Sequence, residues 1–166
     1  MPKSDQGVFL NRYKIIPRTL IFITKGDYVL LLRGAQDKHL WANRYNGVGG
    51  HIERGEDVLN AARRELWEET GLRVSGLWLC GTIVVDADDE VGIGLFIFCG
   101  EYETGELVES QEGQLEWVKM EYLDQYPLVD DLKVLLPHVV NARRGDVPFS
   151  GRSFYDDKDR LQLLFN

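Results

Sequence analysis

The chain has 166 residues, of which 44% are hydrophobic and 28% charged, and its net charge is −8 at pH 7. This composition is typical of one globular domain, here spanning residues 1–166, with a hydrophobic core. The negative charge argues against binding to nucleic-acid polymers or anionic membranes, and no apolar run is long enough to span a bilayer.

Residues 1–17 are expected to form a flexible lead-in. They lack the apolar core of a signal peptide, which predicts a cytoplasmic protein. Two strands are predicted over residues 18–24 and 28–32, with a turn between them at residues 25–27 (KGD). After a polar, irregular stretch, the run NGVGG at residues 46–50 places three glycines within four residues, which lets the backbone approach a ligand closely.

The stretch GHIERGEDVLNAARRELWEETGL, residues 50–72, predicts a helix between two loops. Apolar residues recur with helical spacing over about residues 56–70, and Gly71 supplies a C-terminal stop. Glu56 and Asp57 are expected in the first turn, where the helix dipole favours negative charge.

Glu65, Glu68 and Glu69 are spaced i, i+3 and i+4, so their carboxylates are expected on one helical face. Among the residues three or four positions after them, the one cation is Arg73, at the far end. Clustered carboxylates repel one another unless a cation neutralises them, and hard oxygen ligands suit Mg²⁺ or Mn²⁺. For this spacing alone, a solvated acidic face is the commoner explanation.

The whole stretch, however, resembles the Nudix box at every constrained position. The pattern is Gly50, five residues, Glu56, seven residues, Arg64-Glu65-Leu66, one residue, Glu68-Glu69, one residue and Gly71-Leu72. A chance match at a given start is on the order of 10⁻⁹. The resemblance implies a hydrolase that binds a divalent metal and cleaves a nucleoside diphosphate linked to another moiety. It also implies an α+β fold, with a mixed β-sheet sandwiched between α-helices.

After the box, long strands are predicted over residues 77–86 and 91–102, and the acidic run 86–90 between them is expected to be a solvated hairpin loop. Cys80 and Cys99 lie in these strands without CxxC spacing, which predicts small buried residues in a reducing compartment.

The C-terminal part of the chain predicts a short strand at residues 115–120, a helical turn at 121–125 and a closing hairpin of strands at 151–155 and 161–165. Residues 130–144 predict a second helix, N-capped near Asp130 and kinked or restarted at Pro137.

The resemblance assigns roles to the residues of the box. Glu68 and Glu69 correspond to the core metal ligands, and Glu65 to a further ligand or the base that activates water. Glu56 corresponds to the outer carboxylate, with which Arg64 is expected to pair. Attack on phosphorus needs neutralised oxygens, an activated water and a stabilised leaving group, and Mg²⁺ assists all three.

Two further metal contacts are expected. The Gly50 carbonyl is a plausible ligand, because hard ions accept backbone oxygens. Glu112 lies in a polar loop from which a glutamate reaches the metal in several Nudix enzymes, although a solvated loop glutamate explains it equally well. The sequence leaves the general base open among Glu65, Glu69 and Glu112.

Other features are similar to those of MutT-like oxidised purine nucleoside triphosphatases. The run at residues 46–50 is similar to their WNGxGG, with Tyr45 in place of Trp, and Asp130-Asp131 precede an apolar helix. A carboxylate accepts from purine N–H groups, paired aspartates can share a proton, and Asn46 offers a donor and an acceptor. Helix N-capping explains the aspartates equally well. The substrate-binding candidates are Thr19, Asn46, Gly49, Asp130 and Asp131.

These features predict a Mg²⁺-dependent pyrophosphohydrolase that converts oxidised purine nucleotides such as 8-oxo-dGTP to a nucleoside monophosphate and pyrophosphate. One rival is hydrolysis of ADP-ribose or a dinucleoside polyphosphate; the lack of a proline between Leu72 and Pro127 argues against the ADP-ribose subclass. Another is a non-catalytic nucleotide-binding domain, against which the full carboxylate set argues. The expected partner is a small nucleotide, with no nucleic-acid polymer and no membrane, and a homodimer is left open.

Overall fold

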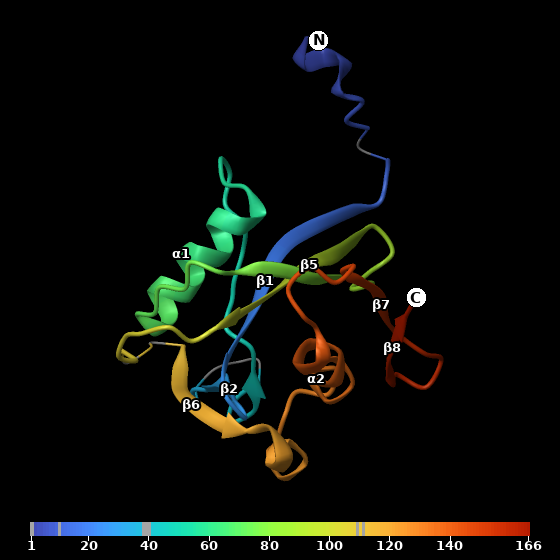
Figure 1. Ribbon diagram of the computed structural model, residues 1–166. Helices are drawn as coiled ribbons and strands as arrows, with labels where there is room; N and C mark the ends of the chain where they lie inside the picture. The colour runs from blue at the N-terminus through green and yellow to red at the C-terminus, as the bar shows by residue number, and fades with distance from the viewer. Residues whose placement is uncertain (1, 10, 38–40, 109, 111) are drawn as a thin grey trace.

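The computed structural model describes residues 2–9, 11–37, 41–108, 110 and 112–166 (Figure 1). Its strands and helices, in chain order, are η1 (Lys3–Gln6), β1 (Lys14–Lys25), β2 (Tyr28–Gly34), β3 (Tyr45–Asn46), α1 (Val58–Thr70), β4 (Trp78–Val85), β5 (Val91–Glu101), β6 (Gly113–Lys119), η2 (Met120–Gln125), α2 (Leu132–Asn141), β7 (Phe149–Tyr155) and β8 (Leu161–Phe165). Here η denotes a 3₁₀-helix.

All of these strands belong to one mixed sheet. Its order is β3-β2-β1-β5-β4-β7-β8, and β6 also pairs with β2, outside this path. The pairs β1–β5 and β4–β7 are parallel, whereas the remaining pairs are antiparallel. Among the described residues, no helix has the length and apolar character needed to cross a membrane.

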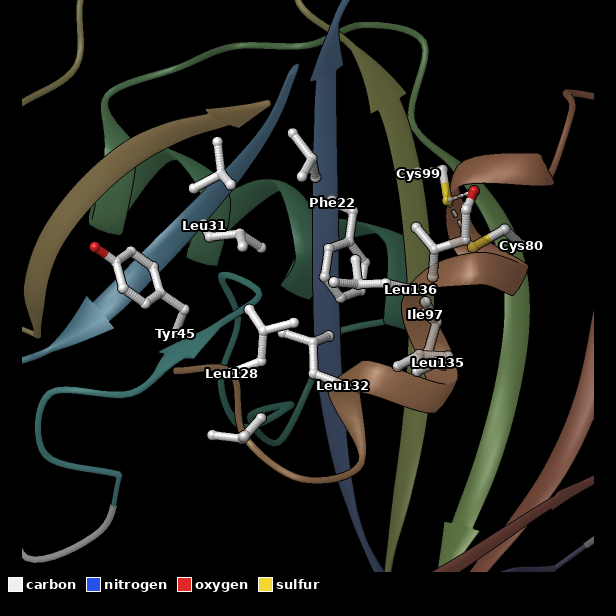
Figure 2. Packing of buried hydrophobic residues seen from close by; sticks show 14 of the residues in the cluster. Phe22, Leu31, Tyr45, Cys80, Ile97, Cys99, Leu128, Leu132, Leu135 and Leu136 are labelled. Carbon is white, nitrogen blue, oxygen red and sulfur yellow. Dashed lines mark hydrogen bonds between the residues drawn. The ribbon is translucent and has the colours of Figure 1, made fainter. Parts of the chain in front are cut away.

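The two faces of the sheet carry separate cores. Side chains alternate along β1, because successive residues of a strand point to opposite faces. Ile21 joins the cluster that contains Leu66 of α1, and Phe22 joins the cluster that contains Leu132 of α2. Figure 2 shows Phe22 packed beside α2. The expected α+β sandwich of a mixed sheet between helices is therefore confirmed.

Helix α1 is defined by signals close to it in the chain. The Asp57 carboxylate accepts hydrogen bonds from the amides of Leu59 and Asn60, both at 3.0 Å, which caps the N-terminus. Gly71, at φ 73°, ends the helix and donates its amide to the Trp67 carbonyl, as expected. The helix begins at Val58, so the prediction that Glu56 and Asp57 form its first turn is wrong.

Two segments predicted to be irregular contain strands. Strand β1 begins at Lys14, where residues 14–16 pair in parallel with residues 91–93 of β5, so the lead-in is shorter than expected. Tyr45 and Asn46 form β3 against β2. Both pairings join residues that are distant in the chain, and local sequence patterns carry no signal for them.

Helix α2 runs through Pro137 as one element rather than restarting there. It covers residues 132–141, shorter at both ends than the predicted 130–144. Its buried face consists of Leu132, Leu135, Leu136 and Val139, which pack on the sheet.

Candidate active site

The glycine loop before α1 lies directly against β1. The Thr19 amide donates to the Gly50 carbonyl at 2.9 Å, and Ile21 and Val48 exchange backbone hydrogen bonds at 2.7 and 3.2 Å. Gly49 has a φ of 149°, and a Cβ there would lie 2.2 Å from the Thr19 carbonyl oxygen. Glycine is therefore required at position 49 for the loop to approach β1 this closely.

The same loop touches the carboxylates of α1. A Cβ at Gly50 would lie 2.5 Å from Oε1 of Glu65, so the absent side chain leaves the space that this carboxylate occupies. The Gly49 amide donates to Oε2 of Glu69 at 3.4 Å. Glycine loop and helix thus form one unit in which backbone groups and carboxylates face each other.

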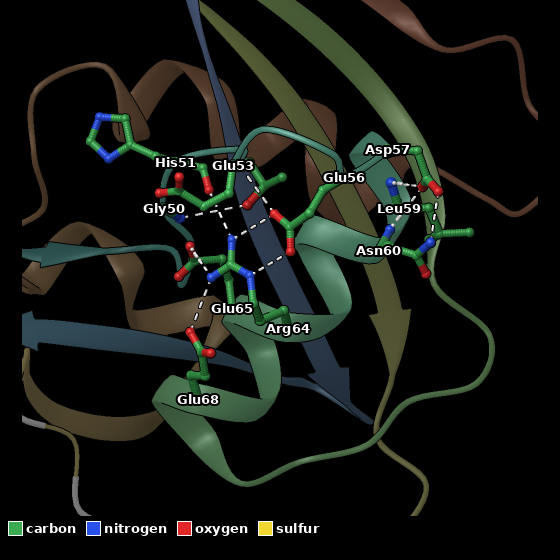
Figure 3. Close-up of polar contacts among 11 residues, drawn as sticks. Gly50, His51, Glu53, Glu56, Asp57, Leu59, Asn60, Arg64, Glu65 and Glu68 are labelled. Atoms are coloured by element: carbon green, nitrogen blue, oxygen red, sulfur yellow. Dashed lines mark hydrogen bonds and ion pairs between the residues drawn. The ribbon is translucent and has the colours of Figure 1, made fainter.

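Arg64 uses all five of its N–H donors inside this unit (Figure 3). Nε and Nη2 bind the two oxygens of Glu56, at 2.7 and 2.9 Å. Nη1 donates to Oε1 of Glu65 at 2.9 Å and to Oε2 of Glu68 at 3.0 Å. Nη2 also donates to the carbonyl of His51 at 3.0 Å. The expected pairing with Glu56 is confirmed, and the other contacts add to it.

A protein cation therefore does serve the acidic face, contrary to the sequence argument. Arg64 lies four residues before Glu68, at helical i, i+4 spacing. Arg64 precedes the three glutamates, whereas the prediction from sequence considered only cations that follow them. The guanidinium of Arg73 lies over the Trp67 ring, 4.2 Å from its centroid.

The network shifts the pKa values of Glu56 and Arg64. Hydrogen bonds from Arg64, followed by that from the Glu53 amide, hold the pKa of Glu56 below its usual range. Hydrogen bonding to Glu56 and then to the other two carboxylates raises the pKa of Arg64 well above its usual range, although burial opposes the rise. Both groups are therefore charged at neutral pH.

Within the described residues, no three His, Cys, Asp or Glu side chains are arranged to hold a metal ion as they stand. The donor set nevertheless fits Mg²⁺ or Mn²⁺ chemically, because carboxylates and the Gly50 carbonyl are hard oxygen ligands. Oxygens of Glu65 and Glu68 already reach one cationic atom, Nη1 of Arg64, at 2.9 and 3.0 Å. Glu65 and Glu68 would hold such an ion with oxygens that now bind Arg64.

The candidates for base recognition come together beside β3. The Tyr45 amide donates to the Pro127 carbonyl, and the Val129 amide donates to the Tyr45 carbonyl, both at 3.0 Å. These bonds join the strand that carries Asn46 to the segment that leads to Asp131. Oδ1 of Asn46 accepts the Gly47 amide at 2.8 Å, so its carbonyl oxygen is engaged and its amide N–H groups are the part left to face a ligand.

The two aspartates have different environments. Asp130 is exposed and pairs with Arg44 at 3.0 Å. Asp131 occupies the N-cap position of α2, but its side chain makes no capping hydrogen bond, which contradicts the N-capping explanation. Burial raises the pKa of Asp131, the charge of Asp130 raises it further, and nearby amides oppose the rise.

Two candidates take other positions. Thr19 is 3% exposed, and its hydroxyl accepts the Gly50 amide at 3.5 Å. It therefore contacts the glycine loop from the interior of the protein. Glu112 is exposed, its carbonyl accepts the Ala35 amide at 3.2 Å, and it leads into β6. The roles of Thr19 in substrate binding and of Glu112 as the base stay predictions.

One polar cluster was not expected. The hydroxyl of Tyr45 donates to Oε2 of Glu116 at 2.5 Å, and that of Tyr126 donates to Oε1 at 3.1 Å. Burial and the bond to Glu116 raise the pKa of Tyr45 to about 12. Glu116 on β6 thereby holds β3, the strand that carries Asn46. The sequence holds no signal for the contact of Tyr45, because 71 residues separate Tyr45 from Glu116.

Comparisons with known proteins agree with this geometry. Residues 14–139 match the NUDIX domain. An oxidized purine nucleoside triphosphate hydrolase from Danio rerio is 35% identical over 136 residues, covering 80% of this chain and 86% of the relative. The NAD-capped RNA hydrolase NudC of Pseudomonas aeruginosa is 29% identical over 82% of this chain but only 48% of its own length. The crystal structure of a mutator MutT protein from Bacillus halodurans superposes with a TM-score of 0.77, at 27% identity, and covers 92% of this chain and 98% of that one.

Proposed function

The chain belongs to the Nudix family of hydrolases, and on that premise we propose that it converts oxidised purine nucleoside triphosphates, such as 8-oxo-dGTP, to the nucleoside monophosphate and pyrophosphate. The observation that carries the proposal is the loop–helix unit described above. In it, three box glutamates share Arg64, and a fourth, Glu69, accepts the Gly49 amide.

Glu65, Glu68 and Glu69 are the residues that would hold Mg²⁺, or Mn²⁺, with the Gly50 carbonyl as a further ligand and Glu56 as the outer carboxylate. The bound ion supplies charge neutralisation at the phosphate oxygens and lowers the pKa of an attacking water. A carboxylate of Glu65, Glu69 or Glu112 takes the proton from that water.

Arg64 has a positioning role in this proposal. It holds Glu56 through two bonds and, without metal, shields the mutual repulsion of Glu65 and Glu68. If Glu65 and Glu68 held an ion, the bidentate pair with Glu56 and the bond to the His51 carbonyl would still hold the guanidinium. Glu65 and Glu68 could therefore bind a metal while the Arg64–Glu56 ion pair stays intact.

The proposed base pocket uses Asn46 and Asp131. The free amide N–H groups of Asn46 suit an acceptor on a purine edge. Because the pKa of Asp131 is raised and its neighbour Asp130 is also acidic, the pair can hold one proton and so both donate and accept. The named activity of the Danio rerio relative supports this substrate class.

In this proposal the whole chain acts as one catalytic domain, since all eight strands among the described residues belong to one sheet. Its partner is a small nucleotide, and the protein is cytoplasmic. The rival is another nucleoside diphosphate derivative: ADP-ribose, a dinucleoside polyphosphate or, given the NudC relative, an NAD-capped end.

The test is a substrate panel at fixed Mg²⁺, with and without EDTA. It contains 8-oxo-dGTP, dGTP, the other dNTPs, ADP-ribose, a dinucleoside polyphosphate and NAD-capped RNA, with products resolved as monophosphate, pyrophosphate or phosphate. Preference for 8-oxo-dGTP with pyrophosphate release, abolished by EDTA, is the expected result. Turnover of another member of the panel instead would keep the metal site and overturn the base pocket.

Matched variants separate the two parts of the site. Glu69→Gln is expected to lower kcat by at least about 100-fold with little change in KM. Glu53→Gln, an exposed carboxylate of the loop that follows Gly50, is its control and is expected to keep wild-type turnover. Asp131→Asn is expected to reduce discrimination between 8-oxo-dGTP and dGTP; an equal loss for both nucleotides contradicts base recognition by Asp131.

A further inference from the structure

Cys80 and Cys99, the two cysteines of the chain, lie side by side with their sulfur atoms 2.7 Å apart. Disulfide bonds have an S–S length of about 2.05 Å, so a small movement closes the remaining gap. Both residues are buried on the face of the sheet that α2 covers, and Figure 2 shows them beside that helix. Active-site helix α1 packs on the opposite face.

The backbone explains why the two thiols meet. Cys99 of β5 pairs with Trp78 of β4, and the register between the strands then shifts, because Leu79 pairs with Phe98 whereas Gly81 pairs with Ile97. Cys80 is therefore the extra residue of a β-bulge. Cys80 follows Trp78 by two residues, so strand alternation places its side chain on the same face as Trp78 and its partner Cys99, and both cysteines belong to one core cluster. Neighbouring strands at this spacing lie within the reach of a disulfide.

Cys80 also has a route to solvent. It lines an open pocket of about 370 Å³ beside the C-terminal end of α2, together with His138, Arg143 and Phe149. One water occupies about 30 Å³ in the liquid, so the pocket admits molecules the size of hydrogen peroxide or a small organic hydroperoxide. Cys99 is not among the residues that line this pocket.

We propose that Cys80 and Cys99 form a site of reversible oxidation at which a hydroperoxide produces an intramolecular disulfide. Cys80 Sγ attacks the peroxide, the O–O bond breaks, and the products are a sulfenic acid on Cys80 and water or an alcohol. Cys99 Sγ then attacks the Cys80 sulfur and expels hydroxide, which takes the thiol proton and leaves as water. Overall, two thiols lose two hydrogen atoms, and the peroxide is reduced; an external thiol reverses the reaction by exchange.

The order of the two steps follows from the surroundings of each thiol. The Cys99 thiol donates a hydrogen bond to Cys80, and this bond and burial raise the pKa of Cys99. Cys99 is therefore the second thiol to react, and Cys80, at the pocket, is the first. Because both side chains are buried, we expect the oxidation to be slow, over minutes to hours with excess peroxide.

The test uses the whole chain. Reduced protein is treated with hydrogen peroxide, unfolded in urea with iodoacetamide and weighed by intact mass spectrometry. We expect a loss of about 2 Da, no alkylation, and recovery of two alkylated thiols after dithiothreitol. We also expect the oxidised protein to show a higher thermal midpoint, because the new bond closes the loop between the two strands.

The matched variants are Cys99→Ser, which leaves Cys80 alone, and Cys80→Ser. Neither can lose 2 Da within one chain, and we expect Cys99→Ser to gain oxygen faster than Cys80→Ser. The wild-type measurement stands even where a variant fails to fold. Wild-type protein that still takes two alkyl groups after peroxide, gains oxygen without losing 2 Da, or forms disulfide-linked dimers on a non-reducing gel overturns the proposal.

Discussion

Replacing Arg64 with lysine tests how the acidic face of α1 is held together. Lysine keeps the positive charge but has three N–H donors in place of five, and it lacks the planar fork that binds both oxygens of Glu56. At least two of the five hydrogen bonds of Arg64 are therefore lost. Nη1, the one nitrogen that bridges Glu65 and Glu68, is absent from lysine, so these two contacts are among those affected.

The size of the effect follows from the exposure of the partners. A hydrogen bond to a charged group contributes about 1.5–3 kcal/mol when shielded from water. The Arg64 side chain is 28% exposed and that of Glu68 54%, so solvent screening reduces each bond to about 1 kcal/mol. We expect Arg64→Lys to lower the free energy of unfolding by about 2 kcal/mol, which lowers Tm by about 4–8 °C in a chain of this length.

Urea unfolding followed by tryptophan fluorescence, together with calorimetry at pH 7, measures this change. Arg63→Lys is the matched control, because Arg63 is the exposed neighbour of Arg64 and lies outside the network; its effect is expected to stay within about 0.5 kcal/mol. Equal stability of Arg64→Lys and wild type, or equal losses in both variants, refutes the claim that the five bonds of Arg64 organise the site.

Three more outcomes are expected. Gly49→Ala, whose Cβ would meet the Thr19 carbonyl at 2.2 Å, should cost about 2–4 kcal/mol in urea unfolding and reduce turnover; an unchanged midpoint contradicts the required close approach. The pKa of Glu56 is lower in the folded state than in the unfolded state, so its contribution to stability is present above the ordinary glutamate pKa and is lost as pH falls through the folded value. Glu56→Gln should therefore flatten the acid side of the stability profile below the ordinary glutamate pKa, and a profile that matches wild type refutes this. Mg²⁺ at 100 times its Kd should stabilise the fold by about 2.7 kcal/mol and therefore raise Tm, and EDTA should remove this rise. An unchanged Tm at every Mg²⁺ concentration contradicts the metal site.

The amino-acid sequence alone determined the parts of this protein that depend on neighbours in the chain. Helix α1 and its glycine stop follow from spacing and composition within one short stretch, and the same stretch carries the Nudix pattern. The pairing of Arg64 with Glu56 belongs to that stretch as well. Such signals are local, because a helix brings residues three and four apart onto one face whatever the rest of the chain does.

Tertiary structure alone decided which distant residues meet. The pairing of Lys14 with Val91, the anchoring of Tyr45 by Glu116 and the contact between Cys80 and Cys99 each join residues from different strands. Strand register and sheet order set these contacts, and local propensity carries no record of either. The sequence therefore specified helix α1 and its row of carboxylates, whereas the fold decided what supports the proposed base pocket and brought two thiols side by side.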